Sequence, residues 1–154
     1  MLTNMQVESL SHLLPEPSSA IGEYEPVFKL HNLLGVSGQL PMVNGEIQFT
    51  GKVGAEVSIK LAKEACEIAT LNALSAVHKN LRGDWSNIAG LFRLIVYINT
   101  TPDFLEHAKI ADSASTILKS LLGQDGMHCR STVGVQSLPL NSCIEIELTF
   151  ITND

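Results

Sequence analysis

Alternating apolar and polar positions near the end of the chain predict two β-strands, because successive side chains of a strand point to opposite faces. Four apolar residues of the last strand share one face: Ile144, Ile146, Leu148 and Phe150. Glu145 and Glu147 lie on its opposite face. The preceding strand opens at Arg130, which by the same rule points the same way as Thr132 and Gly134. We expect the arginine and the two carboxylates to share the second face of the sheet.

Residues 90–99 form the clearest strand of the chain, and both of its faces are apolar. One face carries Phe92, Leu94, Val96 and Ile98, and the other carries Leu91, Ile95 and Tyr97 beside Arg93. A strand with two apolar faces is typical of a sheet that is covered on both sides. Helices can cover one side, and a second copy of the protein is the economical cover for the other.

Two segments have apolar residues that recur every three or four positions, the spacing of an amphipathic helix. The first spans 58–81. The second spans about 104–121, with Asp103 as its N-cap or first-turn acid and Gly123 as its stop. Upstream of both, the Asn44-Gly45 pair between apolar residues predicts a β-hairpin.

The order of these elements, β-β-β-α-β-α-β-β, predicts an α+β fold. Strands that alternate with helices over short connections favour one mixed sheet with both helices packed on one face. Residues 1–19 are expected to form a peripheral N-terminal lead-in, because Pro15 and Pro17 would break any helix begun before them. Residues 20–152 would then form a single domain, which is long enough to bury a real core.

Composition narrows the classes of partner. The chain of 154 residues carries a formal net charge of −6 and has no cluster of lysine and arginine, so its charge argues against a nucleic-acid partner. Three cysteines without a CxxC pair indicate reduced thiols rather than a disulfide framework. No apolar run approaches the roughly 20 residues that cross a bilayer, and the start of the chain does not resemble a signal peptide. We expect a soluble, cytoplasmic protein.

The charged residues of the last two strands allow two interpretations each. Arg130 either ends a strand in solvent or pairs with Glu145 or Glu147, or its planar guanidinium binds a carboxylate ligand through two parallel bonds. The glutamates either face water or, if that side of the sheet is buried, need partners or a task such as proton transfer. The histidines do not cluster, and the chain lacks HExxH, GxGxxG, GxxxxGK[ST] and GxSxG motifs.

Four short motifs, in order, resemble the RidA/YjgF family, also called the L-PSP endoribonuclease or translation-inhibitor family. They are AIGxY near the start, SGQLP at the end of a strand, RSxVxVxxLP late in the chain and IEIE in the last strand. The spacing from Arg130 to Glu145 matches as well. The resemblance covers roughly residues 18–152, and the segments TLNAL and KVGAEVS place the chain in a divergent branch.

The resemblance implies a chorismate-mutase-like fold in which a homotrimer closes its sheets into a central barrel, with helices outside and clefts between subunits. It also implies a 2-imino or 2-enamino acid deaminase that hydrolyses its substrate to a 2-oxo acid and ammonia, without a metal or cofactor. Residue by residue, Arg130 would clamp the carboxylate of the ligand and Glu145 would position the water. Tyr24 would line the pocket, and main-chain groups at Ser37, Gly38 and Thr132 would fix the imine.

Two other functions stay open at this point. The clefts could bind small 2-oxo or amino acids without catalysis, and the older family name suggests RNA cleavage, which the acidic charge argues against. This chain has Thr132 where the best-known members have cysteine, so the wall of the pocket differs, and either a changed substrate or weak activity is expected.

Overall fold

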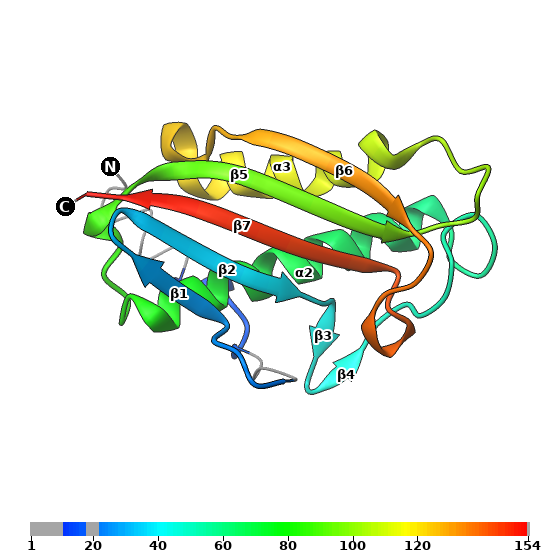
Figure 1. The fold of residues 1–154 in the computed structure, drawn as a ribbon, viewed down its shortest axis with the longest axis horizontal. Coiled ribbons are helices and arrows are strands. Elements are labelled where there is room, and N and C mark those ends of the chain that lie inside the picture. The colour runs from blue at the N-terminus through cyan, green and yellow to red at the C-terminus, as the bar shows by residue number, and fades with distance from the viewer. Residues whose placement is uncertain (1–10, 18–21, 154) are drawn as a thin grey trace.

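The computed structural model describes residues 11–17 and 22–153 and is built around a five-stranded sheet with two long helices on one of its faces (Figure 1). The five-stranded sheet has the order β1-β2-β7-β5-β6. Its strands are β1 (Val27–Leu30), β2 (Leu33–Gln39), β5 (Ile88–Asn99), β6 (Cys129–Val135) and β7 (Ile144–Thr152). The other elements are the hairpin β3 (Met42–Val43) and β4 (Glu46–Ile47), and the helices α2 (Ile59–Asn80) and α3 (His107–Leu122).

All neighbouring strands of the main sheet are antiparallel except β5 and β6, which are parallel and joined by α3. This mixed sheet with both helices behind it confirms the predicted α+β class (Figure 1). The described chain has one more short strand before α2 than expected, because β3 and β4 pair only with each other. Asn44 and Gly45, which connect β3 to β4, have φ values of 52° and 83°, and a tight hairpin turn requires such positive values.

Helix α2 lies where the periodicity predicts it and packs closely because its buried face is made of small residues. Ser58 is the N-cap and accepts a hydrogen bond from the backbone N–H of Leu61 at 3.3 Å. The small buried residues along this helix include Ala62, Ala65, Cys66, Ala69 and Ala73, all with no exposed surface.

Helix α3 begins three residues later than expected. The structure places its N-cap at Glu106, so Asp103 does not cap the helix. The reason is a turn after β5, in which the backbone N–H of Phe104 bonds the carbonyl of Thr101 at 3.2 Å. The helix therefore starts only at His107, whose ring meets the ring of Phe104 edge to face.

Two irregularities of β5 change which residues face the helices. The register with β7 shifts between Ile88 and Gly90 and again between Leu91 and Arg93. A bulge inserts an extra residue and interrupts the alternation of faces. Leu91 is consequently buried, whereas Phe92 is 53% exposed. The expected assignment of Leu91 to the second face and of Phe92 to the first is wrong for this reason.

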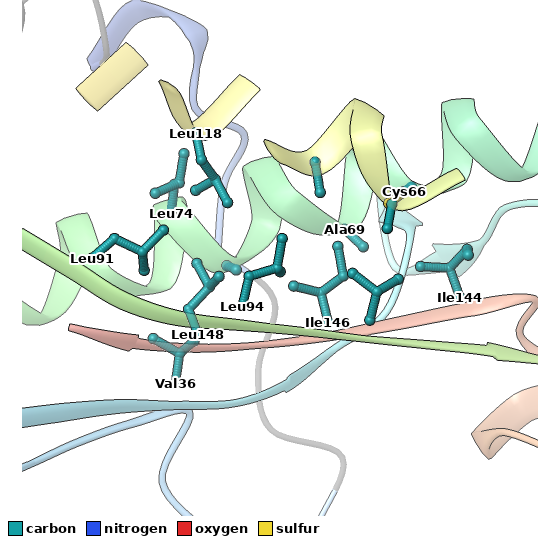
Figure 2. Packing of buried hydrophobic residues seen from close by; sticks show 14 of the residues in the cluster. Val36, Cys66, Ala69, Leu74, Leu91, Leu94, Leu118, Ile144, Ile146 and Leu148 are labelled. Carbon is teal, nitrogen blue, oxygen red and sulfur yellow. The ribbon is translucent and has the colours of Figure 1, made fainter. Parts of the chain in front are cut away.

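The core fills the space between the sheet and the helices (Figure 2). Figure 2 shows side chains of β2, β5, β7, α2 and α3 meeting there, among them Val36, Leu94, Ile146, Leu148, Leu74 and Leu118. The opposite face of the sheet, which we call the outer face, is left uncovered by residues 11–17 and 22–153. It carries exposed apolar side chains at Phe28, Leu30, Leu33 and Val133. In the described part of the chain, none of the helices is long and apolar enough to cross a membrane.

Candidate functional site: two half-sites on opposite faces of the sheet

The first half-site is built around a bulge in β2. The register between β2 and β7 shifts between Val36 and Gln39, so that Ser37 and Gly38 occupy an irregular step. A Cβ atom on Gly38 would lie 1.9 Å from the carboxylate oxygen Oε1 of Glu145 and 2.8 Å from its Cδ. Only glycine leaves room for that carboxylate. Gly38 of β2 and Glu145 of β7 therefore lie against each other and form the first half-site.

The pKa of Glu145 is raised above its usual value, first by burial and then by the charge of Glu147 two residues away. The hydroxyl of Tyr97 donates to Oε2 of Glu147 at 3.3 Å, and burial followed by the Glu147 charge raises the pKa of Tyr97. No hydrogen bond or ion pair reaches the Glu145 carboxylate from residues 11–17 or 22–153. A carboxyl group with raised proton affinity is thus available to a ligand on the outer face.

The second half-site lies on the helix side of β6. Arg130 pairs in register with Leu94, which is buried beneath the helices, so its side chain points toward α3. Its Nη1 donates to Oδ1 of Asp112 at 2.9 Å and to Oγ of Ser115 at 3.0 Å. The expectation that Arg130 shares a face with the glutamates, or pairs with one of them, is therefore wrong. The parallel register between β6 and β5 determines which face of the sheet Arg130 lies on. The alternation of residues within β6 alone cannot predict that face.

The arginine side chain is held by one end only. Asp112 and Ser115 both bind Nη1, and among the described residues no group bonds Nε or Nη2 of Arg130. These two nitrogens form the edge of guanidinium that makes two parallel bonds to a carboxylate. The half-site therefore holds the guanidinium in place while it leaves its bidentate edge free.

Sequence reasoning missed the residues that hold Arg130. Asp112 and Ser115 are three positions apart, so they share a face of α3, and that spacing was the available signal. Ser115 also contacts Nε2 of His128 at 3.0 Å, and Nδ1 of His128 bonds the carbonyl of Gly126 at 2.7 Å. This pairing assigns the proton to Nδ1 and makes Nε2 the acceptor. Burial lowers the pKa of His128, which favours that neutral form.

The remaining predicted site residues lie near one half-site or the other. Thr132 follows Arg130 on the helix side of β6, opposite Val96. Ser37 donates its hydroxyl to the carbonyl of Glu25 at 2.7 Å, so that side chain ties the incoming segment to β2. Tyr24 directly precedes Glu25 in the sequence, and its side chain is 48% exposed.

One chain cannot bring the two half-sites together. Arg130 and Thr132 face the helices, whereas Glu145 and the space over Gly38 belong to the outer face. The sheet itself separates them, and β5 lies between β6 and β7. A site that uses both Arg130 and Glu145 must take them from two different chains.

Two of the three cysteines are buried, and the third, Cys129, is exposed. Burial raises the pKa of Cys66 to about 11 and that of Cys143 to about 12, so neither is a thiolate near neutral pH. Within residues 11–17 and 22–153, no group of three or more His, Cys, Asp or Glu side chains is arranged to hold a metal ion.

The sequence matches one family model over almost its whole length. The family is described as "YjgF/chorismate mutase-like, putative endoribonuclease", and residues 6–151 match it. The chain belongs to this family, which is the RidA/YjgF family. Protein TCP17 of Trypanosoma cruzi is 32% identical over 115 residues, which are 74% of this chain and 71% of that protein.

Solved structures share the fold closely. A protein of unknown function from Agrobacterium tumefaciens is 35% identical, with a TM-score of 0.87 over 97% of this chain and 91% of its own. A "putative endoribonuclease" from Shewanella oneidensis is 31% identical, with a TM-score of 0.88 over 96% and 97% of the two chains. Escherichia coli TdcF with bound serine is 21% identical, with a TM-score of 0.62 over 90% and 94%, and shows the fold alone.

Proposed function

We propose that this protein hydrolyses reactive 2-imino or 2-enamino acids to 2-oxo acids and ammonia. The observation that carries the proposal is the pair of half-sites. One offers a held guanidinium with its bidentate edge free, and the other offers a carboxyl group whose pKa is raised. A substrate with a carboxylate next to an electrophilic carbon needs those two groups.

The chemistry asks little of the protein. Arg130 binds the substrate carboxylate through Nε and Nη2, which fixes the imine carbon in place. Glu145 accepts a proton as water attacks that carbon, and it returns a proton to the nitrogen, which leaves as ammonia when the carbonyl forms. A carboxyl group with raised pKa suits both transfers, and main-chain groups at Gly38 and Thr132 would orient the nitrogen.

We propose in addition that the protein is a homotrimer with its sites between subunits. A cyclic trimer has head-to-tail interfaces, in which one surface of a chain meets a different surface of the next. Such an interface can join the α3–β6 side of one chain to the outer face of its neighbour. The exposed apolar residues Phe28, Leu30 and Leu33 would then be covered, as expected for an interface core.

RNA cleavage is the function that the names of the family and of the Shewanella protein suggest. Arg130 supplies the positive charge of the candidate site, and it is already paired with Asp112. The chain as a whole carries a net charge of −6. Phosphate backbones bind where lysine and arginine gather. The arrangement favours a single small carboxylate over a polyanion, and binding of such a ligand without turnover is the second candidate.

The test combines turnover with binding. Imines are generated in situ by an amino-acid oxidase, release of 2-oxo acid is followed, and affinity for a 2-oxo acid is measured by calorimetry. Arg130→Lys keeps the charge but loses the planar fork, so kcat/KM should fall by about ten- to a hundredfold, given ~1.5–3 kcal/mol for a charge-assisted bond. Glu145→Gln should lower kcat while 2-oxo acid binding survives.

Each outcome separates the candidates. Wild-type affinity in Arg130→Lys would mean that the arginine is structural and would overturn the proposal. Binding without any turnover in the wild type would favour the binding protein. Cleavage of RNA by highly purified protein, abolished in Arg130→Ala, would favour the ribonuclease.

A further inference from the structure

A cavity lies at the carboxyl ends of β5 and β6, beside the amino end of α3. Its volume is about 540 Å³, and its walls include Thr100, Phe104, His107 and Gly134. A volume of this size fits a small-molecule ligand. The carboxyl ends of parallel strands, next to a helix N-terminus, are where α/β units bind ligands.

Two polar side chains converge in this cavity over Gly134. A Cβ atom at Gly134 would lie 2.5 Å from Nε2 of His107 and 2.9 Å from Oγ1 of Thr100. Thr100 is only 8% exposed, and its hydroxyl has no hydrogen-bond partner among residues 11–17 and 22–153. The Thr100 oxygen is not among the fully buried unsatisfied atoms, so it opens into the cavity and can bond a ligand. A ligand atom above Gly134 would satisfy both groups.

The charges around the cavity favour an anion. Lys52 donates its Nζ to three uncharged oxygens, on the Asn99 side chain and on the carbonyls of Thr100 and Gln136. The Glu56 carboxylate bonds the backbone N–H of Lys52 instead of the ammonium. The N-terminus of α3 adds partial positive charge, and Glu106 at that terminus pairs with Lys109.

We propose that this cavity, which we call the β5–β6 pocket, binds a small carboxylate ion separately from Arg130. The carboxylate would accept hydrogen bonds from Thr100 and His107, while its aliphatic part would lie against Pro102 and Phe104. Gly134 is four residues beyond Arg130 on β6, about 13 Å at 3.3 Å per residue, so one short ligand cannot occupy both places. The proposal does not depend on the imine chemistry.

The test uses histidine rings as reporters in the full-length protein. With ¹³C-labelled histidine, the His107 ring reports on the β5–β6 pocket, and the His128 ring, through Ser115, reports on Arg130. Sodium acetate should shift the His107 signal saturably, and sodium chloride at equal ionic strength should not. Arg130→Lys should leave the His107 response intact.

Two variants remove the pocket by different means. Thr100→Val deletes the hydroxyl at constant shape and should weaken acetate binding by about two- to tenfold, the worth of one hydrogen bond. Gly134→Ala fills the gap and should weaken it at least as much. Gly35→Ala is the matched control, because a Cβ there meets only the carbonyl of Phe28 at 3.9 Å. An unsaturable His107 response, its loss in Arg130→Lys, or unchanged affinity in both pocket variants would overturn the proposal.

Discussion

Gly38 stands beneath the Glu145 carboxylate, and its missing side chain leaves room for that group. Alanine there would place a Cβ 1.9 Å from Oε1, so the carboxylate would have to move. We expect Gly38→Ala to lower kcat for imine hydrolysis by about tenfold or more, since positioned acid–base groups contribute at least about a hundredfold. Rates are compared with Gly35→Ala, after light scattering has shown that both variants assemble normally. Equal rates in the two variants would contradict the role of Gly38.

The raised pKa of Glu145 makes a stability prediction with a definite sign. The folded state binds the proton more tightly than the unfolded chain, so stability is lost as pH rises from the ordinary value of 4.5 through the raised pKa. Glu145→Gln should therefore raise the free energy of unfolding at pH 7, by less than about 1 kcal/mol because the group is partly solvated, and the melting temperature should rise with it. At pH values well below 4.5 the difference should vanish.

The control for this pH dependence is Glu67→Gln, which removes a carboxylate from the exposed side of α2. Thermal unfolding of the three proteins is followed across the pH range. A Glu145→Gln variant that matches the wild type at both ends of the range would show that Glu145 is not desolvated.

At the scale of single residues, the sequence determines direction within a strand but not the face of the sheet. The alternation in β6 predicts that Arg130, Thr132 and Gly134 point the same way, and they do. Whether that way is toward Glu145 depends on the register between β6 and β5, which is a long-range property. The contact of Arg130 with Asp112 and Ser115 follows from that register.

At the scale of elements, patterns predict strands and helices well and bulges poorly. The hairpin at Asn44-Gly45 and the span of α2 follow from local rules. The bulges of β5 and β2 have no comparable local pattern, because an extra residue is accommodated by the partner strand. The bulge at Ser37 and Gly38 is the one that shapes the candidate site.

The close approach of α2 to the sheet gives a prediction about packing. Ala69 is fully buried on the face of α2 that meets the core (Figure 2). Ala69→Leu would add methylenes to a filled space and should destabilise the fold by about 1–3 kcal/mol. Glu67→Leu, on the exposed side of the same helix, should change stability by no more than about 0.5 kcal/mol. Denaturant unfolding measures both, and an equal effect would mean that the space beside Ala69 is not filled.

At the scale of the whole molecule, the two half-sites require an assembly. The outer face keeps its apolar residues exposed in one chain, and no described element covers Glu145 from above. A homotrimer predicts a mass in solution of three times the 16.7 kDa of the chain. Light scattering that gives the mass of the monomer would remove the shared site, and with it the proposed role of Arg130 and Glu145 together.

Because Arg130 and Glu145 lie on opposite faces, two inactive variants should restore each other when mixed. Arg130→Ala chains keep Glu145, and Glu145→Gln chains keep Arg130, so an interface between unlike chains contains one site with both groups. In a head-to-tail ring assembled at random from equal amounts, roughly a quarter of the sites are complete. We expect about that fraction of wild-type activity after the two variants are unfolded and refolded together. Each variant refolded alone is the control, and so is the double variant mixed with wild type. Activity that stays at the level of the separate variants would show that each site is built within one chain, against the geometry of this sheet.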